Sequence, residues 1–281
     1  MRARAALGLL RPANCAMMGF AVIVGFFVSK PSAPSASQAA LGFLAGFFFC
    51  ASSMAVNDIY DVEVDRVNRP DRPIPSGKVS VREAVWLAVA TLAAGVVSSL
   101  LTLSAWAVAI ALTYGSLSWV YNSRAKQTGL PGNLIVASSL AIPFVYGGVI
   151  SGGDLGRSLL SMMALTAFFS GVGREVVKGM ADVEGDAKRG VSSVARRSGP
   201  RTAAFVGAGF FLLAVVMSCV PLALGMANAI YTTGVAVPDV IFVYLAASIV
   251  RRSGPANAHR VKGIALAGMA AGLLVFVGGA F

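Results

Sequence analysis

Charged residues are scarce in this sequence. Asp, Glu, Lys and Arg together make up 12 % of 281 positions, about half the share that a soluble domain carries, which excludes an ordinary soluble enzyme. The one histidine, His259, lies among basic residues before the last apolar segment and is interpreted as a loop cation. The three cysteines lie singly in apolar segments, without the spacing of a metal site or a disulfide framework.

Apolar residues are abundant: the hydrophobic set makes up 57 % of the chain, and the mean hydropathy is +0.76. They gather in runs of about 20 residues, the length at which a helix crosses a bilayer. We therefore predict an all-α polytopic membrane protein, one domain over residues 1–281, with nine transmembrane helices around a central cavity. The predicted spans are 12–29, 38–57, 83–102, 104–121, 131–150, 158–177, 202–221, 230–250 and 262–281.

The basic residues fall on one side of this arrangement. If the N-terminus is cytoplasmic, 21 of the 23 lie at that terminus or in the loops after the second, fourth, sixth and eighth spans, and only Lys30 and Arg157 lie opposite. Cytoplasmic loops are enriched in Lys and Arg, so this segregation predicts a cytoplasmic N-terminus and active site and an external C-terminus. It also explains the net charge of +11 without nucleic acid.

A cleaved signal peptide is an alternative for the start of the chain, because basic residues precede an apolar run that ends in small residues. Against it, Asn14 places a polar amide just inside that run, where a signal sequence gains nothing.

Nine of the twelve acidic residues fall in two windows, each at the predicted cytoplasmic end of a span. On a helix, Asn57, Asp58, Asp61 and Asp65 lie near one stripe, because their spacings are close to multiples of the helical turn. Glu63 points away from it. The first window therefore presents stacked oxygen ligands on one helix face.

The second window repeats this arrangement. Glu175, Asp182 and Asp186 are spaced i, i+7 and i+11, with Lys178 on the same face. Stacked carboxylates repel one another unless a cation lies among them, and Mg²⁺ takes oxygen ligands completed by substrate phosphates. Solvated helix ends paired with arginines are the alternative, but they do not require two single-face stripes. The predicted metal ligands are Asn57, Asp58, Asp61, Asp65, Asp182 and Asp186.

Basic residues surround the predicted metal site. Pro70, Pro73, Pro75 and Gly77 break the helix pattern after the first window and predict a turning loop that carries Arg72. The loop after the fourth span supplies further polar groups on the same side, namely Tyr121, Arg124 and Lys126. Such cations suit a bound diphosphate.

These motifs resemble the UbiA superfamily of intramembrane prenyltransferases. Residues 57–77 match its NDxxDxxxD signature and the following N-x-P-x-R-P-I-P-S-G run, and the first span contains Arg-Pro-x-Asn at 11–14. The second acid motif, REVVKGMADVEGD, is most similar to the archaeal ether-lipid branch, the digeranylgeranylglyceryl phosphate synthases. The ending DVEGD also occurs in chlorophyll and homogentisate prenyltransferases. The resemblance covers the whole chain.

The resemblance implies transfer of a geranylgeranyl group, with Mg²⁺, from geranylgeranyl diphosphate to the sn-2 hydroxyl of geranylgeranylglyceryl phosphate. It implies membrane lipid as the surroundings, and neither nucleic acid nor a protein partner. An aromatic acceptor such as 4-hydroxybenzoate is the alternative. The catalytic residues would be Asp61, Asp65, Asp182 and Asp186, and the substrate-binding residues Asn14, Arg72, Tyr121, Arg124, Lys126, Arg174, Glu175 and Lys178.

Two other classes of membrane protein fit less well. A transporter favours acidic residues near the bilayer midplane, whereas these acids cluster at one interface beside a proline-rich loop. A purely structural membrane protein has no need for acids in this register.

Overall fold

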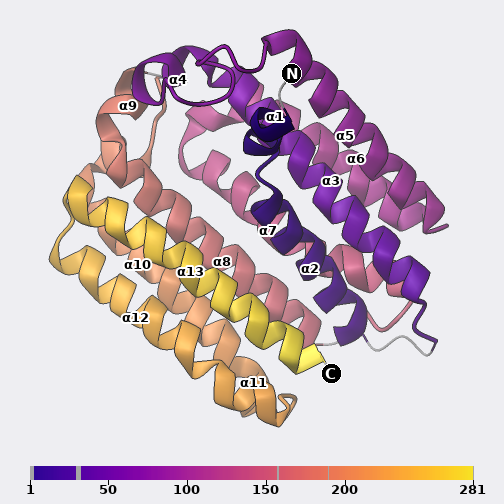
Figure 1. Ribbon diagram of the computed structural model, residues 1–281. Helices are drawn as coiled ribbons and strands as arrows, with labels where there is room; N and C mark the ends of the chain where they lie inside the picture. Colours follow the sequence, from indigo (N-terminus) through magenta and orange to yellow (C-terminus); the bar gives the residue numbers. More distant parts are fainter. Residues whose placement is uncertain (1–2, 30–32, 157, 189, 281) are drawn as a thin grey trace.

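The computed structural model describes residues 3–29, 33–156, 158–188 and 190–280, which form helices and no strand. Figure 1 shows the long helices side by side in one bundle. Lys30 and Arg157, predicted on the external side, lie outside the described residues, as do Arg2 and Arg189. The elements are α1 (Ala3–Leu10), α2 (Pro12–Val28), α3 (Ala36–Tyr60), α4 (Val62–Asn68), α5 (Val81–Leu101), α6 (Ala105–Ser123), η1 (Ala125–Thr128), α7 (Leu130–Ser151), α8 (Ser158–Ala181), α9 (Val183–Lys188), α10 (Val194–Ala223), α11 (Ala229–Gly234), α12 (Ala236–Arg251) and α13 (Pro255–Ala280).

Each predicted span coincides with a long helix or a helix pair, but the count of nine membrane spans is not confirmed. In the described part of the chain, seven helices are long and apolar enough to cross a membrane, or eight if the bent pair α1 and α2 forms one span. α6 is outside this set because Ser, Tyr, Trp and Asn side chains interrupt its apolar sequence. α1 and α2 meet at 47°, at a break before Pro12.

Local sequence explains where several helices begin. Ser35 and Ser104 cap α3 and α6 through hydrogen bonds to the backbone N–H groups of Gln38 and Ala107. Ser80 and Glu83 form a reciprocal capping box at the start of α5, and such caps satisfy backbone groups that the first turn leaves unpaired.

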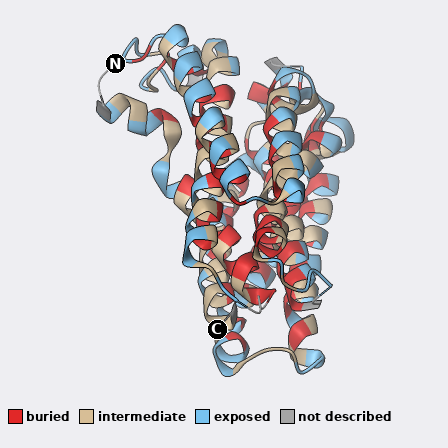
Figure 2. Cartoon of the chain, turned by 90° about the vertical axis from the view of Figure 1, so that its right-hand side faces the viewer, coloured by how far each residue is buried: buried red, intermediate tan, exposed pale blue. Residues whose placement is uncertain are grey.

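Buried residues concentrate on the helix faces that point into the bundle (Figure 2). The bundle closes tightly between α2 and α7, where a Cβ added to Gly147 would lie 2.0 Å from the carbonyl oxygen of Val22. Cys15 and Cys50, separate in the sequence, interact across α2 and α3. This packing brings the first and second parts of the chain into one body.

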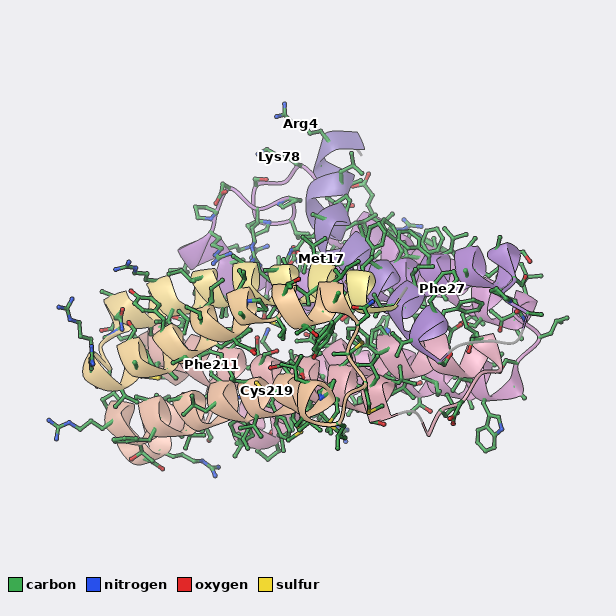
Figure 3. The ribbon with its side chains drawn as sticks, turned by 90° about the horizontal axis from the view of Figure 1, so that it is seen from below. Arg4, Met17, Phe27, Lys78, Phe211 and Cys219 are labelled. Atoms are coloured by element: carbon green, nitrogen blue, oxygen red, sulfur yellow. The ribbon has the colours of Figure 1, made fainter. Side chains whose placement is uncertain are left out.

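The short helices α4 and α9 lie at the same end of the bundle, opposite α11 and the C-terminus (Figure 1). The turns of residues 69–80 pack against α1, where Ile74 and Val79 are buried with Leu9. Arg4 and Lys78 project from this part of the molecule (Figure 3). The predicted turning loop over the helix end is therefore confirmed, and both acid windows lie at one end.

Candidate active site

The first acid window is a helix, a break and a second helix, rather than the continuous helix that the stripe assumed. α3 ends at Tyr60, and Asp61 has φ −89° and ψ 0° before α4 begins. Backbone hydrogen bonds from Asp61 to the Asn57 carbonyl and from Asp65 to the Asp61 carbonyl keep the helical spacing across the break. The acids therefore still lie near one another.

Basic residues from other segments bind these acids in two groups. Arg72 donates to Asp58 Oδ1 at 3.2 Å and to Asp65 Oδ2 at 2.5 Å, so the proline-rich loop joins both carboxylates. Lys126 Nζ lies 2.5 and 2.6 Å from the two carboxylate oxygens of Asp61 and 3.2 Å from Asn57 Oδ1. The predicted stripe is thus held as two pairs, Asp58 with Asp65 and Asn57 with Asp61.

Arg11 was not predicted as a site residue. In the sequence it counts only among the basic residues of the cytoplasmic side and within the Arg-Pro-x-Asn motif. Arg11 lies between α1 and α2 with a left-handed backbone at φ 52°, and its guanidinium is 2.5 Å from Asp58 Oδ1. Asp58 is only 5 % exposed in its side chain, so a buried carboxylate is paired with two arginines. Its charge would otherwise be costly to bury.

The second window has the same build. α8 ends at Ala181, Asp182 stands between the helices, and the Asp186 N–H donates to the Asp182 carbonyl at 2.8 Å. Glu175, 5 % exposed, accepts from Arg174 at 3.0 Å and from Lys178 at 2.8 Å. Lys178, predicted to bind substrate, is therefore paired with the buried Glu175 in this structure.

The two windows face each other across Tyr121. The Tyr121 side chain interacts electrostatically with Asp61 of the first window and with Glu175, Lys178 and Asp186 of the second. A backbone hydrogen bond of 2.9 Å from Ser192 to the Gln127 carbonyl joins the segments that follow α9 and α6. Residues distant in sequence therefore share one site.

Two predicted site residues have weaker ties to it. Asn14 lies in the first turn of α2 with a half-buried side chain, and Arg124 caps the end of α6 with an exposed one. Glu63 pairs with Arg66 at the surface, as its position away from the stripe predicted.

The donors fit a magnesium ion, although no group of three or more His, Cys, Asp or Glu side chains converges among the described residues. Mg²⁺ is commonly bound through one or two carboxylates, waters and substrate phosphates rather than in an all-protein cage. Asn57 and Asp61, and Asp182 and Asp186, are the residues whose side-chain oxygens could bind such an ion.

The chain is similar to known proteins along nearly its whole length. The sequence profile of the UbiA prenyltransferase family matches residues 18–276. The chain is 38 % identical to the digeranylgeranylglyceryl phosphate synthase of Archaeoglobus fulgidus, across 97 % of this chain and 94 % of that protein. For the synthase of Thermococcus kodakarensis the identity is 34 %, over 93 % and 92 %.

Solved structures share the fold. One, from work on digeranylgeranylglyceryl phosphate synthase in membranes, has a TM-score of 0.79 and 31 % identity, over 99 % of this chain and 98 % of that one. A UbiA homologue from Archaeoglobus fulgidus bound to GPP and Mg²⁺ has a TM-score of 0.69 and 22 % identity, over 97 % and 99 %.

Proposed function

Because this chain belongs to the UbiA prenyltransferase family, we propose that it transfers a geranylgeranyl group from its diphosphate to the sn-2 hydroxyl of geranylgeranylglyceryl phosphate. The observation that carries this proposal is the meeting of two acid windows, each with its cations, at one end of a membrane helix bundle. The C1–oxygen bond of geranylgeranyl diphosphate breaks and its electron pair leaves with the diphosphate, while C1 forms an ether bond to the acceptor oxygen and the sn-2 hydroxyl gives up its proton.

We propose that Asn57, Asp58, Asp61, Asp65, Asp182 and Asp186 hold Mg²⁺. Mg²⁺ bound there neutralises negative charge on the diphosphate leaving group. Arg72 and Lys126 already lie beside these carboxylates, and both can turn to phosphate oxygens, for which charge-assisted hydrogen bonds are strong. Removal of Mg²⁺ with EDTA should abolish transfer, and full activity in EDTA would contradict this assignment.

The ether-lipid acceptor is supported by identity to the synthases named above and by the number of cations at the site. A phosphomonoester brings a charge of about −1.5 to −2, which requires basic groups beyond those that bind the diphosphate. Lys178, with a side chain 51 % exposed, reaches solvent while it pairs with Glu175. It can therefore also contact an acceptor phosphate.

The acceptor is tested with purified full-length protein. Geranylgeranyl diphosphate is supplied with either geranylgeranylglyceryl phosphate or 4-hydroxybenzoate, and the products are identified by mass spectrometry. Ether formation with the lipid alone supports the proposal. If only the aromatic acid is prenylated, the family assignment stands and the proposed acceptor is wrong.

We also propose that the active site and the N-terminus face the cytoplasm. In a variant without native cysteines, single cysteines at Ser76 and Ala187 should react with an impermeant reagent only from the cytoplasmic side. A cysteine at Ser37 should react only from the opposite side. Labelling of Ser76 and Ala187 from different sides would contradict a shared site.

A further inference from the structure

An apolar cavity lies inside the bundle beneath the candidate active site, between α2, α7, α8, α10, α12 and α13. Its upper wall continues the helix faces of the site: Met17 and Met18 follow Asn14 by about one turn, and Ser170 precedes Arg174 by one turn. Met17 lies beside α13 in Figure 3. A hydrocarbon chain attached to a head group at the site would enter this cavity.

The far end of the cavity is polar, unlike most of its wall. Asp239 of α12 lies there with Oδ1 2.7 Å from Ser218 Oγ, and the Tyr231 hydroxyl donates to the Ser218 carbonyl at 2.8 Å. The Tyr231 ring stacks on Phe276 at a centroid distance of 6.0 Å, and Phe276 packs edge-on against Phe144 at 5.9 Å. Phe144, Phe276, Ser218 and Asp239 line the cavity here, and Tyr231 packs behind Phe276.

Helix geometry gives the depth of this end. A Cβ added to Gly173 would lie 3.0 Å from the Gly207 carbonyl oxygen, so these two positions are level in neighbouring helices. Ser218 follows Gly207 by eleven residues on α10, which is roughly 16 Å at 1.5 Å per residue. Glu175 lies about 3 Å above Gly173 by the same rise. This depth suits a chain of several isoprene units.

The polar end resists a longer chain. Ser218 Oγ lies 2.7 Å from both the Val215 carbonyl oxygen and Asp239 Oδ1. The Ser218 hydroxyl donates to both oxygens, so Asp239 is held in place by a shared hydrogen bond. Among the described residues no basic side chain pairs with Asp239. A chain that reached this point would displace the polar contacts of a half-buried carboxyl group and a buried hydroxyl, and its methyl groups cannot form hydrogen bonds in their place, which is unfavourable.

We propose that Asp239 determines specificity by setting the maximum length of the prenyl chain, with Ser218 as the residue that positions its carboxyl group. The cavity would hold the prenyl chain of the diphosphate donor. That chain begins at the reacting carbon, which lies directly beneath the diphosphate. This role of Asp239 rests on the proposed function only for the prenyl diphosphate donor, and it does not depend on which acceptor is used.

The test measures chain-length preference in the full-length protein in lipid nanodiscs. Competition binding and kcat/KM are compared for geranylgeranyl diphosphate and for a diphosphate one isoprene unit longer. Asp239→Leu should raise the preference for the longer chain about tenfold, because it removes a polar group whose displacement is costly. Asp239→Asn, which keeps a polar group of the same size, should stay within about twofold of the parent protein.

Asp154→Leu is the matched control, since Asp154 is an exposed acid outside the cavity, and it should leave the preference unchanged. An unchanged preference in Asp239→Leu would overturn the proposal. If that variant does not fold, the smaller Asp239→Val replaces it with the same expectation. If the parent protein uses no glyceryl phosphate acceptor yet shows these binding preferences, the proposed acceptor fails and the role of Asp239 stands.

Discussion

The two acid windows share a backbone design and differ in the source of their cations. Each is a long helix, an aspartate at a break and a short helix, with a 2.8 Å hydrogen bond from the N–H four residues later to the carbonyl of that aspartate. In the first window the cations come from other segments, namely the break between α1 and α2, the loop after α4, and η1. In the second, the cations on Glu175 come from its own helix.

This difference separates cations on connecting segments from cations on the same helix as the acid they pair with. Arg72 and Lys126 belong to a loop and a single 3₁₀ turn, so they can move to a bound anion without unwinding the helix that carries the acids. Arg174 and Lys178 are held near Glu175 by the helix itself, because residues three apart are neighbours on a helix surface. We therefore expect Arg72 and Lys126 to bind the diphosphate, and Arg174 and Lys178 mainly to stabilise the buried Glu175, with Lys178 also able to reach an acceptor phosphate.

The largest expected effect is a loss of turnover when the aspartate at either helix break is replaced. Asp61→Asn and Asp182→Asn should each lower turnover by at least about a hundredfold, because both breaks carry proposed metal ligands. Glu63→Gln, at an exposed acid that pairs with Arg66, is the control and should keep near-normal turnover. Circular dichroism checks that each variant is folded. A large loss at one break only would show that the windows are not equivalent.

A smaller effect tests the difference between the cations. Lys126→Gln should weaken binding of geranylgeranyl diphosphate about tenfold, whereas Lys178→Gln should change it less than threefold, since charge-assisted bonds contribute about 1.5–3 kcal/mol. Without substrate, Lys126→Gln should bind Mg²⁺ more tightly, because a cation that competes for Asp61 is gone. Calorimetric titration measures both affinities. Equal losses for the two lysines would contradict the proposed division.

The smallest effect concerns the connection between the windows. Gly129 has φ +78°, and a Cβ there would lie 2.0 Å from the Ser192 carbonyl oxygen. Gly190 has φ +68° and open space around it. Gly190→Ala should cost about 1–2 kcal/mol for its left-handed backbone, and Gly129→Ala should lower the unfolding temperature further because it also separates two segments. Identical unfolding temperatures for the Gly129→Ala and Gly190→Ala variants would exclude tight packing of Gly129 against Ser192.

Much of the site was predictable because its residues are local in sequence. Asp61 and Asp65 occur at helical spacing, and a proline-rich run places Arg72 on a turn nearby, so oxygen ligands and a cation at one helix end could be inferred. Identity to known synthases then confirmed the family that the motifs suggested. These features follow from the spacing of neighbouring residues, so no knowledge of long-range contacts was needed to predict them.

Other features depend on tertiary structure and were not predictable. The contact of Arg11 with Asp58 joins residues 47 positions apart and needs the left-handed turn between α1 and α2. The break at Asp61 was missed because spacing alone does not distinguish one helix from two that keep the same register. The span count of nine is not confirmed, because polar and aromatic side chains interrupt the apolar sequence of α6.

The hydrogen bond from Ser192 to Gln127 has a consequence for hydrogen exchange. Its amide proton is shared with a carbonyl from a distant part of the chain, so it exchanges with deuterium only when the two segments move apart. The free energy of that local opening can therefore be read from one amide. Protection of Ser192 would report how often the site opens and how strongly a bound substrate keeps it shut.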